Sequence, residues 1–180
     1  MKNILRKSTA VILAIMTSLM MFGNVYAQQV DSGEFANARA MTNVKTVMRD
    51  GSVKALGTTR GRVLATAEME LTDKGGGEVD IYVEVFCHES VSKLRMKVYL
   101  EKWVESSNKW SVVDTKEQIW TSEEYGDDLS MGILNYNVLG VSAGKYRLRG
   151  SFSARGIVSG ISEAWTHSTD ALQIGRATTP

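Results

Sequence analysis

Hydrophobic and polar residues alternate with a period of two from Arg60 almost to the end of the chain. Between Val79 and Cys87, for example, apolar residues occupy every second position. Successive side chains of a strand point to opposite faces of a sheet, so this alternation indicates strands with one buried face. Short polar or glycine-rich turns separate the segments that show it: residues 60–72, 78–88, 93–105, 109–121, 128–139, 144–155 and 160–174. The pattern predicts one all-β domain over residues 59–175, an antiparallel two-sheet β-sandwich of about seven strands.

The preceding segment, residues 28–58, has a weaker pattern. Asp50-Gly51 lies between the apolar stretches Val44–Met48 and Val53–Leu56, which is typical of a short hairpin. An N-terminal arm without regular structure is the alternative for the same residues. Residues 176–180 are expected to form a C-terminal tail.

Residues 1–27 have the three parts of a cleaved secretory signal peptide. A positive start is followed by the apolar run Ala10–Gly23, and Val25-Tyr26-Ala27 supplies the small residues that signal peptidase requires. The cations of the start are Lys2, Arg6 and Lys7. The apolar run is shorter than the roughly 20 residues that cross a bilayer, so we expect release and no stable membrane insertion after cleavage. The predicted location is extracellular, with periplasmic retention as the alternative in a cell that has an outer membrane.

Charge and cysteine content restrict the partners. The chain carries 21 Lys and Arg against 20 Asp and Glu, and three of the cations belong to the predicted signal. The remainder has no basic excess to neutralise phosphates, so we expect no nucleic-acid partner. Cys87 is the sole cysteine, so no intramolecular disulfide can form. It shares the alternating positions of Val79–Val85, which predicts a small core residue with an unreactive thiol.

The stretch Leu139–Leu148 resembles the approach to the sixth strand of immunoglobulin and fibronectin type III domains. In those domains a tyrosine hydroxyl folds back onto the backbone a few residues upstream. The resemblance implies that Tyr146 does the same and that the sandwich is immunoglobulin-like. The chain departs from antibody domains, because Leu148 stands where they place a disulfide cysteine.

A second resemblance rests on four short stretches: Lys109-Trp110-x-x-Val113, Gly144–Gly150, Ser159–Ala164 and Ala171–Gly175. Through them the chain resembles a family of small secreted proteins of Gram-positive, gut-type bacteria. That family is a domain family of unknown function. The resemblance implies a fold and an extracellular compartment. It transfers no site, cofactor or activity.

No pattern in the chain predicts catalysis or a cofactor. The two histidines, His88 and His167, are expected to face outward from different sheets, whereas a zinc site needs three or four ligands close together. Nucleophilic catalysis needs a Ser or Cys beside a base, and no motif indicates one. The acidic stretch Glu123–Asp128 admits calcium, which prefers several oxygen ligands on a loop, but a solvated turn is the simpler interpretation. We therefore expect a non-enzymatic protein with no metal and no cofactor.

Binding is better supported than catalysis. The hydrophobic positions of each strand are taken to face the core, with Leu172 as the reference residue in the last strand. The side chains at the alternate positions then face solvent on the third, sixth and seventh strands. These strands are neighbours in an immunoglobulin-like sheet, so one face would carry Tyr99, Trp103, Arg147, Arg149, Trp165 and His167. Trp, Tyr and Arg are enriched at contact hot spots, and flat aromatic rings can stack on sugars. A one-residue bulge would instead turn Trp103 or Trp165 into the core.

The leading hypothesis is a secreted, non-enzymatic module that binds a protein or a glycan through this face. Trp110 and Trp120 are expected to pack within the domain. One alternative is a structural secreted protein whose exposed strands assemble with copies of itself. The other is a carbohydrate-active hydrolase, which would need two carboxylates facing each other across a cleft.

Overall fold

The computed structural model of the chain describes residues 33–175. The predicted signal peptide and the predicted tail lie outside the described residues, as do residues 28–32. The described elements, in order, are the 3-10 turn η2 (Gly33–Phe35), β1 (Arg39–Ala40), β2 (Thr42–Arg49), β3 (Ser52–Thr58), β4 (Leu64–Gly75), β5 (Glu78–Cys87), β6 (Val91–Val104), β7 (Lys109–Thr121), the single helical turn α2 (Ser122–Tyr125), β8 (Met131–Leu139), β9 (Gly144–Gly156), β10 (Ser162–Ser168) and β11 (Leu172–Ile174).

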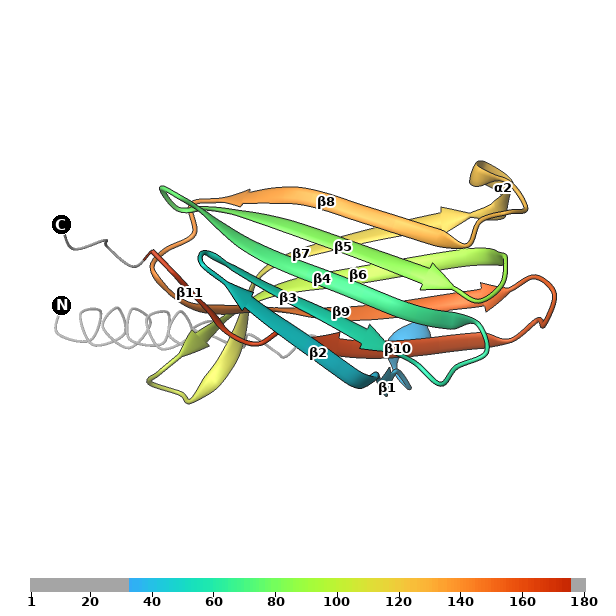
Figure 1. Cartoon of the computed structure of the whole chain (residues 1–180), viewed down its shortest axis with the longest axis horizontal. Coiled ribbons are helices and arrows are strands. Elements are labelled where there is room, and N and C mark those ends of the chain that lie inside the picture. Colours follow the sequence, from blue (N-terminus) through green and yellow to red (C-terminus); the bar gives the residue numbers. More distant parts are fainter. Residues whose placement is uncertain (1–32, 176–180) are drawn as a thin grey trace, which may run out of the picture. The chain divides into compact units, whose positions relative to one another are not determined.

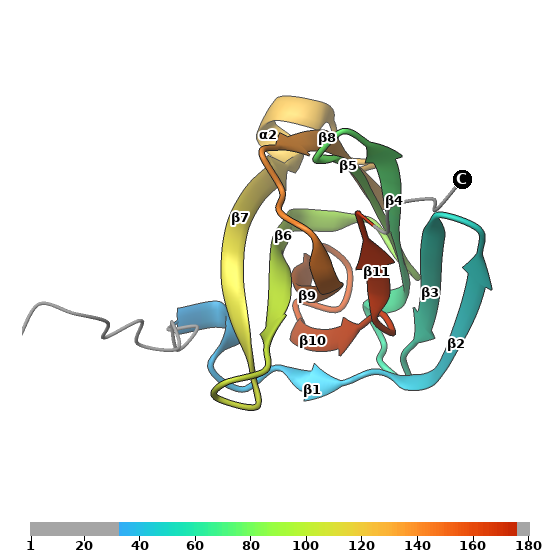
Figure 2. The same cartoon turned by 90° about the vertical axis from the view of Figure 1, so that its left-hand side faces the viewer.

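The strands form two sheets that face each other (Figure 1). Sheet A has the order β1-β10-β9-β6-β7, with β11 also paired to β9, and sheet B has the order β2-β3-β4-β5-β8. The predicted all-β, two-sheet architecture is confirmed. The prediction that all pairing is antiparallel is wrong, because β1 runs parallel to β10 and makes sheet A mixed. Figure 2 shows two places where the chain crosses from sheet A to sheet B: from β1 into β2, and from β7 through α2 into β8.

The hydrophobic positions of the long strands fill the space between the sheets. In β5 every second residue from Val79 to Val85 is fully buried, and Ile81 is among them. Across the interior, Leu94, Leu148 and Phe152 of sheet A are fully buried as well. Burial of apolar area is the main force that holds such a sandwich, at about 25 cal/mol per Å². The apolar residues at alternate positions are therefore buried between the sheets, as their spacing predicts.

The segment before the predicted sandwich forms a hairpin in the structure. β2 and β3 pair antiparallel, and Asp50-Gly51 makes the turn between Arg49 and Ser52. Gly51 has a φ of 73°, a conformation that a residue without a Cβ adopts at little cost. Strand β3 buries Val53 and Ala55 against the core, whereas β2 is the outer strand of sheet B and is almost entirely exposed.

Tyr146 ties the start of β9 to the loop before it. Its hydroxyl donates a hydrogen bond to the backbone carbonyl of Ser142, at 2.8 Å, and its side chain is buried among the core residues. The Lys102 ammonium lies 5.5 Å from the centre of the Tyr146 ring and bonds the Ser142 hydroxyl at 2.6 Å. The backward reach of the Tyr146 hydroxyl agrees with the resemblance drawn from this stretch.

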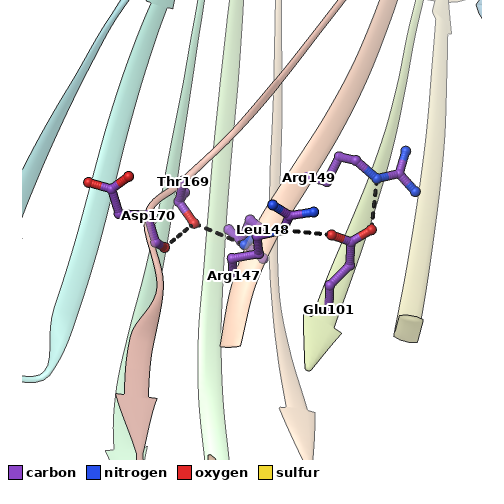
Figure 3. Close-up of polar contacts among 6 residues, drawn as sticks. All are labelled: Glu101, Arg147, Leu148, Arg149, Thr169 and Asp170. Carbon is purple, nitrogen blue, oxygen red and sulfur yellow. Dashed lines mark hydrogen bonds and ion pairs between the residues drawn. The ribbon is translucent and has the colours of Figure 1, made fainter. Parts of the chain in front are cut away.

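The predicted last strand, residues 160–174, is two strands with a slip between them. In β10, Ser168 pairs with Arg149, but Leu172 in β11 pairs with Tyr146. Between these two pairs, three residues of the last segment lie opposite only two residues of β9. Thr169 continues the register of β10. Its hydroxyl accepts the Leu148 N–H at 3.0 Å (Figure 3), and its backbone N–H bonds the Leu148 carbonyl at 2.9 Å. The extra residue therefore lies in Asp170-Ala171, opposite Arg147. A slip of one residue exchanges the two faces of a strand.

Candidate binding site

Two of the residues expected on the exposed face lie in the core. Trp165 pairs with Phe152, and His167 pairs with Gly150. Both are 7% exposed and point between the sheets. The prediction that they face solvent is wrong because it counted faces back from Leu172, across the slip at Asp170-Ala171. The bulge alternative is what the structure shows for Trp165.

His167 is a neutral histidine in an apolar setting. Its ring lies 5.7 Å from that of Phe152, centre to centre, and neither ring nitrogen has a hydrogen-bond partner among the described residues. Burial disfavours the charged form and lowers the pKa of His167 to about 4, while nearby backbone groups of Ala67 and Ser168 raise it only in part. Protonation of His167 therefore opposes folding.

We expect the domain to lose stability as the pH falls from about 6.5 towards 4, because the unfolded chain then binds a proton that the folded one rejects. The difference between an ordinary histidine pKa and one of about 4 corresponds to about 3 kcal/mol at most. Urea unfolding of the wild type and of His167→Leu across this range measures it. The variant should lose less stability than the wild type over the same interval, and parallel profiles would contradict the assignment.

Tyr99 faces outward from sheet A but is fully buried. The guanidinium of Arg149 lies over its ring, with Cζ 3.8 Å from the ring centre, and the Lys97 ammonium is 5.4 Å from the same centre. Cations attract the negative face of an aromatic ring at such distances. The prediction that Tyr99 is exposed is therefore wrong, although the face of the sheet is the predicted one.

A single carboxylate holds two arginines beside these rings. Glu101 is 5% exposed, and its two oxygens accept hydrogen bonds from Nε of Arg147 and Nε of Arg149, each at 2.8 Å (Figure 3). The arginine side chains remain about one-quarter exposed. Bonds between ionised groups are stronger than neutral ones, and a shared carboxylate fixes both guanidinium groups in place.

Two tryptophans complete the group. Trp103 and Trp110 pair across β6 and β7, with ring centres 5.3 Å apart in an edge-to-face arrangement. Cζ of Arg147 lies 4.3 Å from the centre of the Trp110 ring. Both tryptophans are partly exposed. We call the residues that these contacts join the aromatic–arginine cluster: Tyr99, Glu101, Trp103, Trp110, Arg147 and Arg149.

Trp110 was not expected in this cluster. Trp110 and Trp120 share the same alternating positions, and Trp120 is buried in the core as predicted. The pairing of β7 shifts at a bulge, where Leu100 lies opposite Asp114 but Glu101 lies opposite Val112. The extra residue, Val113, exchanges the faces of β7, so Trp110 emerges outside the sheet.

The outer side of sheet A is not an open aromatic platform. Phe35 of η2 is 4% exposed, and the Arg95 guanidinium lies 4.7 Å from the centre of its ring. Arg95 in turn donates to Glu117 at 2.7 Å. The middle of this face is therefore covered, and the partly exposed tryptophans and arginines lie towards one end of β6 and β9.

The remaining residues considered for chemistry, the cysteine, His88 and the acidic stretch, occupy positions that the structure defines. Cys87 packs against the core, and burial raises the pKa of its thiol to about 12, so it stays protonated and unreactive at neutral pH. His88 is exposed, and the acids of Glu123–Asp128 lie exposed around α2. Among residues 33–175, no three His, Cys, Asp or Glu side chains are grouped as a metal site would require. No helix in that part of the chain is long and apolar enough to cross a membrane.

Comparison with known proteins gives no family for this chain. No family model matches it, and no curated protein is similar enough to count as a relative.

Proposed function

We propose that this chain is a secreted, non-enzymatic interaction module that binds a protein or glycan ligand through the aromatic–arginine cluster. The observation that carries the proposal is the position of Glu101. It is a nearly buried charge on the outer side of a sheet, and it holds Arg147 and Arg149 against aromatic rings. Fixing long side chains before a ligand arrives reduces the entropy lost on binding.

The cluster also has the right residue types for recognition. Trp, Tyr and Arg contribute most of the binding energy at many interfaces. The Arg147 guanidinium lies over one face of the Trp110 ring, and both side chains remain partly exposed, so a ligand with acidic and flat apolar parts can contact the cation and the aromatic rings together. Such a ligand would be an acidic peptide segment or an acidic sugar chain.

We further propose that the sandwich is of the immunoglobulin type and close to fibronectin type III domains. Two observations support this: the strand orders β4-β5-β8 and β10-β9-β6-β7, and the Tyr146 hydroxyl bonded to Ser142. Domains of this type often serve as binding modules, although fold alone does not assign a function. Export from the cell is part of the same proposal and rests on the pattern of residues 1–27.

The test is ligand retention by the full chain and by matched variants on a glycan array and a panel of purified extracellular proteins. Arg147→Gln and Trp103→Ala should each weaken binding of any retained ligand at least tenfold. Because both side chains are partly exposed, each variant should lose no more than about 1 kcal/mol of unfolding free energy. Lys116→Gln, an exposed cation on β7 outside the cluster, is the control and should bind as the wild type does.

Two results would contradict the proposal. One is a ligand that both cluster variants retain with wild-type affinity. The other is a loss of several kcal/mol of stability in Arg147→Gln, which would make the cluster a structural clamp.

A second candidate function, self-assembly into a structural protein, is supported by strand β2. It is the outer strand of sheet B, and its apolar residues Val44, Val47 and Met48 are 39–52% exposed. An exposed edge strand can pair with another chain. Light scattering over a concentration series separates the two functions, since only self-assembly predicts a mass that rises with protein concentration.

A further inference from the structure

Strand β8 is the outer strand of sheet B on the side away from β2, and no strand lies beyond it among residues 33–175 (Figure 1). It pairs with β5 from Met131 to Leu139 without a bulge. Just before it, the Cys87 N–H bonds the Ser130 carbonyl at 2.8 Å. In an antiparallel ladder, residues that bond the neighbouring strand alternate with residues that do not. The even-numbered residues of β8 therefore bond β5, and the odd-numbered ones direct their N–H and C=O groups towards the open edge.

Strand β8 lacks the features that usually protect an edge from other strands. It contains no charged residue. The other long outer strands, β2 and β7, both carry charges, among them Lys45, Arg49 and Lys116, and the pairing of each has a shift in register. Charged side chains and bulges are common devices against pairing between chains. Of these three strands, β8 is therefore the one best suited to accept a partner.

The exposed side chains of β8 are apolar at both ends and uncharged in the middle. Met131 and Ile133 are 39% and 45% exposed, and Leu139 at the far end is 74% exposed. Phe86 of β5, which pairs with Met131, is 42% exposed. The central residue, Asn135, is exposed as well. A strand with this pattern matches a reversed copy of itself, because its two apolar ends then meet and no like charges do.

An antiparallel pair of β8 strands has one arrangement that uses the whole strand. With a two-fold axis at Asn135, the middle of Met131–Leu139, every residue of β8 pairs, whereas any other centre leaves residues at the ends without partners. Met131 then lies opposite Leu139 of the second copy, Ile133 lies opposite its Asn137, and Asn135 lies opposite its own counterpart. Each facing pair of odd-numbered residues exchanges two hydrogen bonds, which gives about ten bonds in all. That is the number found in a typical protein–protein interface.

We propose that β8 is a homodimer interface, at which a second copy of this chain pairs antiparallel about Asn135 and joins the two sheets B into one. The contact is isologous, so this association stops at two copies, unlike assembly through β2. The two-fold axis runs perpendicular to the joined sheet, so both sheets A lie on the same side of it. Their aromatic–arginine clusters therefore face the same direction, which lets one long ligand engage both. The interface itself depends on neither of the functions proposed above.

The test is the molar mass of the full chain, measured by light scattering over a concentration series that extends to the near-millimolar range. The mass should rise from one chain to two and then level off. Asn135→Lys places two cations opposite each other and should raise the dissociation constant at least about tenfold. Asn135→Glu should do the same with two anions. An equimolar mixture of the two variants should dimerise again, with a dissociation constant within about threefold of the wild-type value, because opposite charges then face each other.

Hydrogen exchange locates the contact on the chain. The backbone N–H groups of Ile133, Asn135 and Asn137 should exchange more slowly as the mass doubles, because they gain acceptors. Val47→Glu, at an exposed position of β2, is the control and should dimerise as the wild type does. A mass of one chain at every concentration would leave β8 to a strand of another protein and overturn the proposal. Undiminished dimerisation of Asn135→Lys, or loss of the dimer in Val47→Glu, would overturn it as well.

Discussion

Replacing Trp165 with alanine is expected to lower the free energy of unfolding by about 3–5 kcal/mol. The side chain is 7% exposed and belongs to the core cluster between the sheets. Alanine would remove a large apolar surface from the interior and leave a cavity that the paired strands β9 and β10 cannot close. Urea unfolding followed by circular dichroism measures the loss.

Trp103→Ala is the matched control for this prediction. Trp103 lies on the outer side of sheet A, partly exposed, with Trp110 as its aromatic neighbour. It should lose no more than about 1 kcal/mol, in the range of a single aromatic pair. Equal losses of unfolding free energy in Trp165→Ala and Trp103→Ala would contradict the placement of Trp165 in the core and Trp103 on the outer face.

Glu163→Ala is expected to be comparably harmful, at about 3–5 kcal/mol. Its carboxylate accepts three backbone N–H groups at the start of β4, and two of these belong to the fully buried Val63 and Leu64. Hydrogen bonds to a charged group contribute about 1.5–3 kcal/mol each, and buried donors left without an acceptor add a penalty. Glu163→Gln keeps one acceptor oxygen and should recover part of the loss.

The contribution of Glu163 depends on pH in a defined direction. Burial alone would raise the pKa of its carboxyl, but the three backbone donors outweigh it and lower the pKa below the ordinary 4.5. The stabilisation is therefore present above pH 4.5 and is lost as the pH falls through the lower folded-state pKa. Glu124→Ala, an exposed acid in α2, is the control and should stay within about 0.5 kcal/mol of the wild type. A similar loss in both variants would contradict the role assigned to Glu163.

Most of the sandwich follows from alternation alone. The segments predicted from 60–72 to 144–155 correspond to β4–β9 with shifts of a few residues at their ends. Alternation was reliable here because an uninterrupted strand cannot exchange its faces without burying polar residues. Val79 to Val85 in β5 is the clearest example.

The errors arise where the chain inserts one residue. The slip at Asp170-Ala171 sends Trp165 and His167 inward, and the bulge at Val113 sends Trp110 outward. Neither site has a glycine or proline to mark it. Both are decided by pairing with distant strands, such as the two bonds between Thr169 and Leu148. Such long-range pairing leaves no local pattern in a single sequence.

The candidate site was half predicted for the same reason. Tyr99, Trp103, Arg147 and Arg149 lie on strands whose faces were counted correctly, and the structure brings them together. Glu101 has the same outward position as Tyr99 and Trp103, and that position could have indicated its part in the cluster. What the sequence could not show is that the arginines would fold over Tyr99 and bury it, because this depends on side-chain geometry across β6 and β9.

The lone thiol of Cys87 also bears on where such a domain can fold. No covalent bridge joins the two sheets, since a chain with one cysteine cannot form one within itself. Glutathione and oxygen do not alter side-chain packing or hydrogen bonds. The Cys87 sulfur is largely buried and protonated, so it reacts little in thiol–disulfide exchange. The same native state is thus equally accessible under reducing and oxidising conditions, with no isomerase or oxidant needed to reach it.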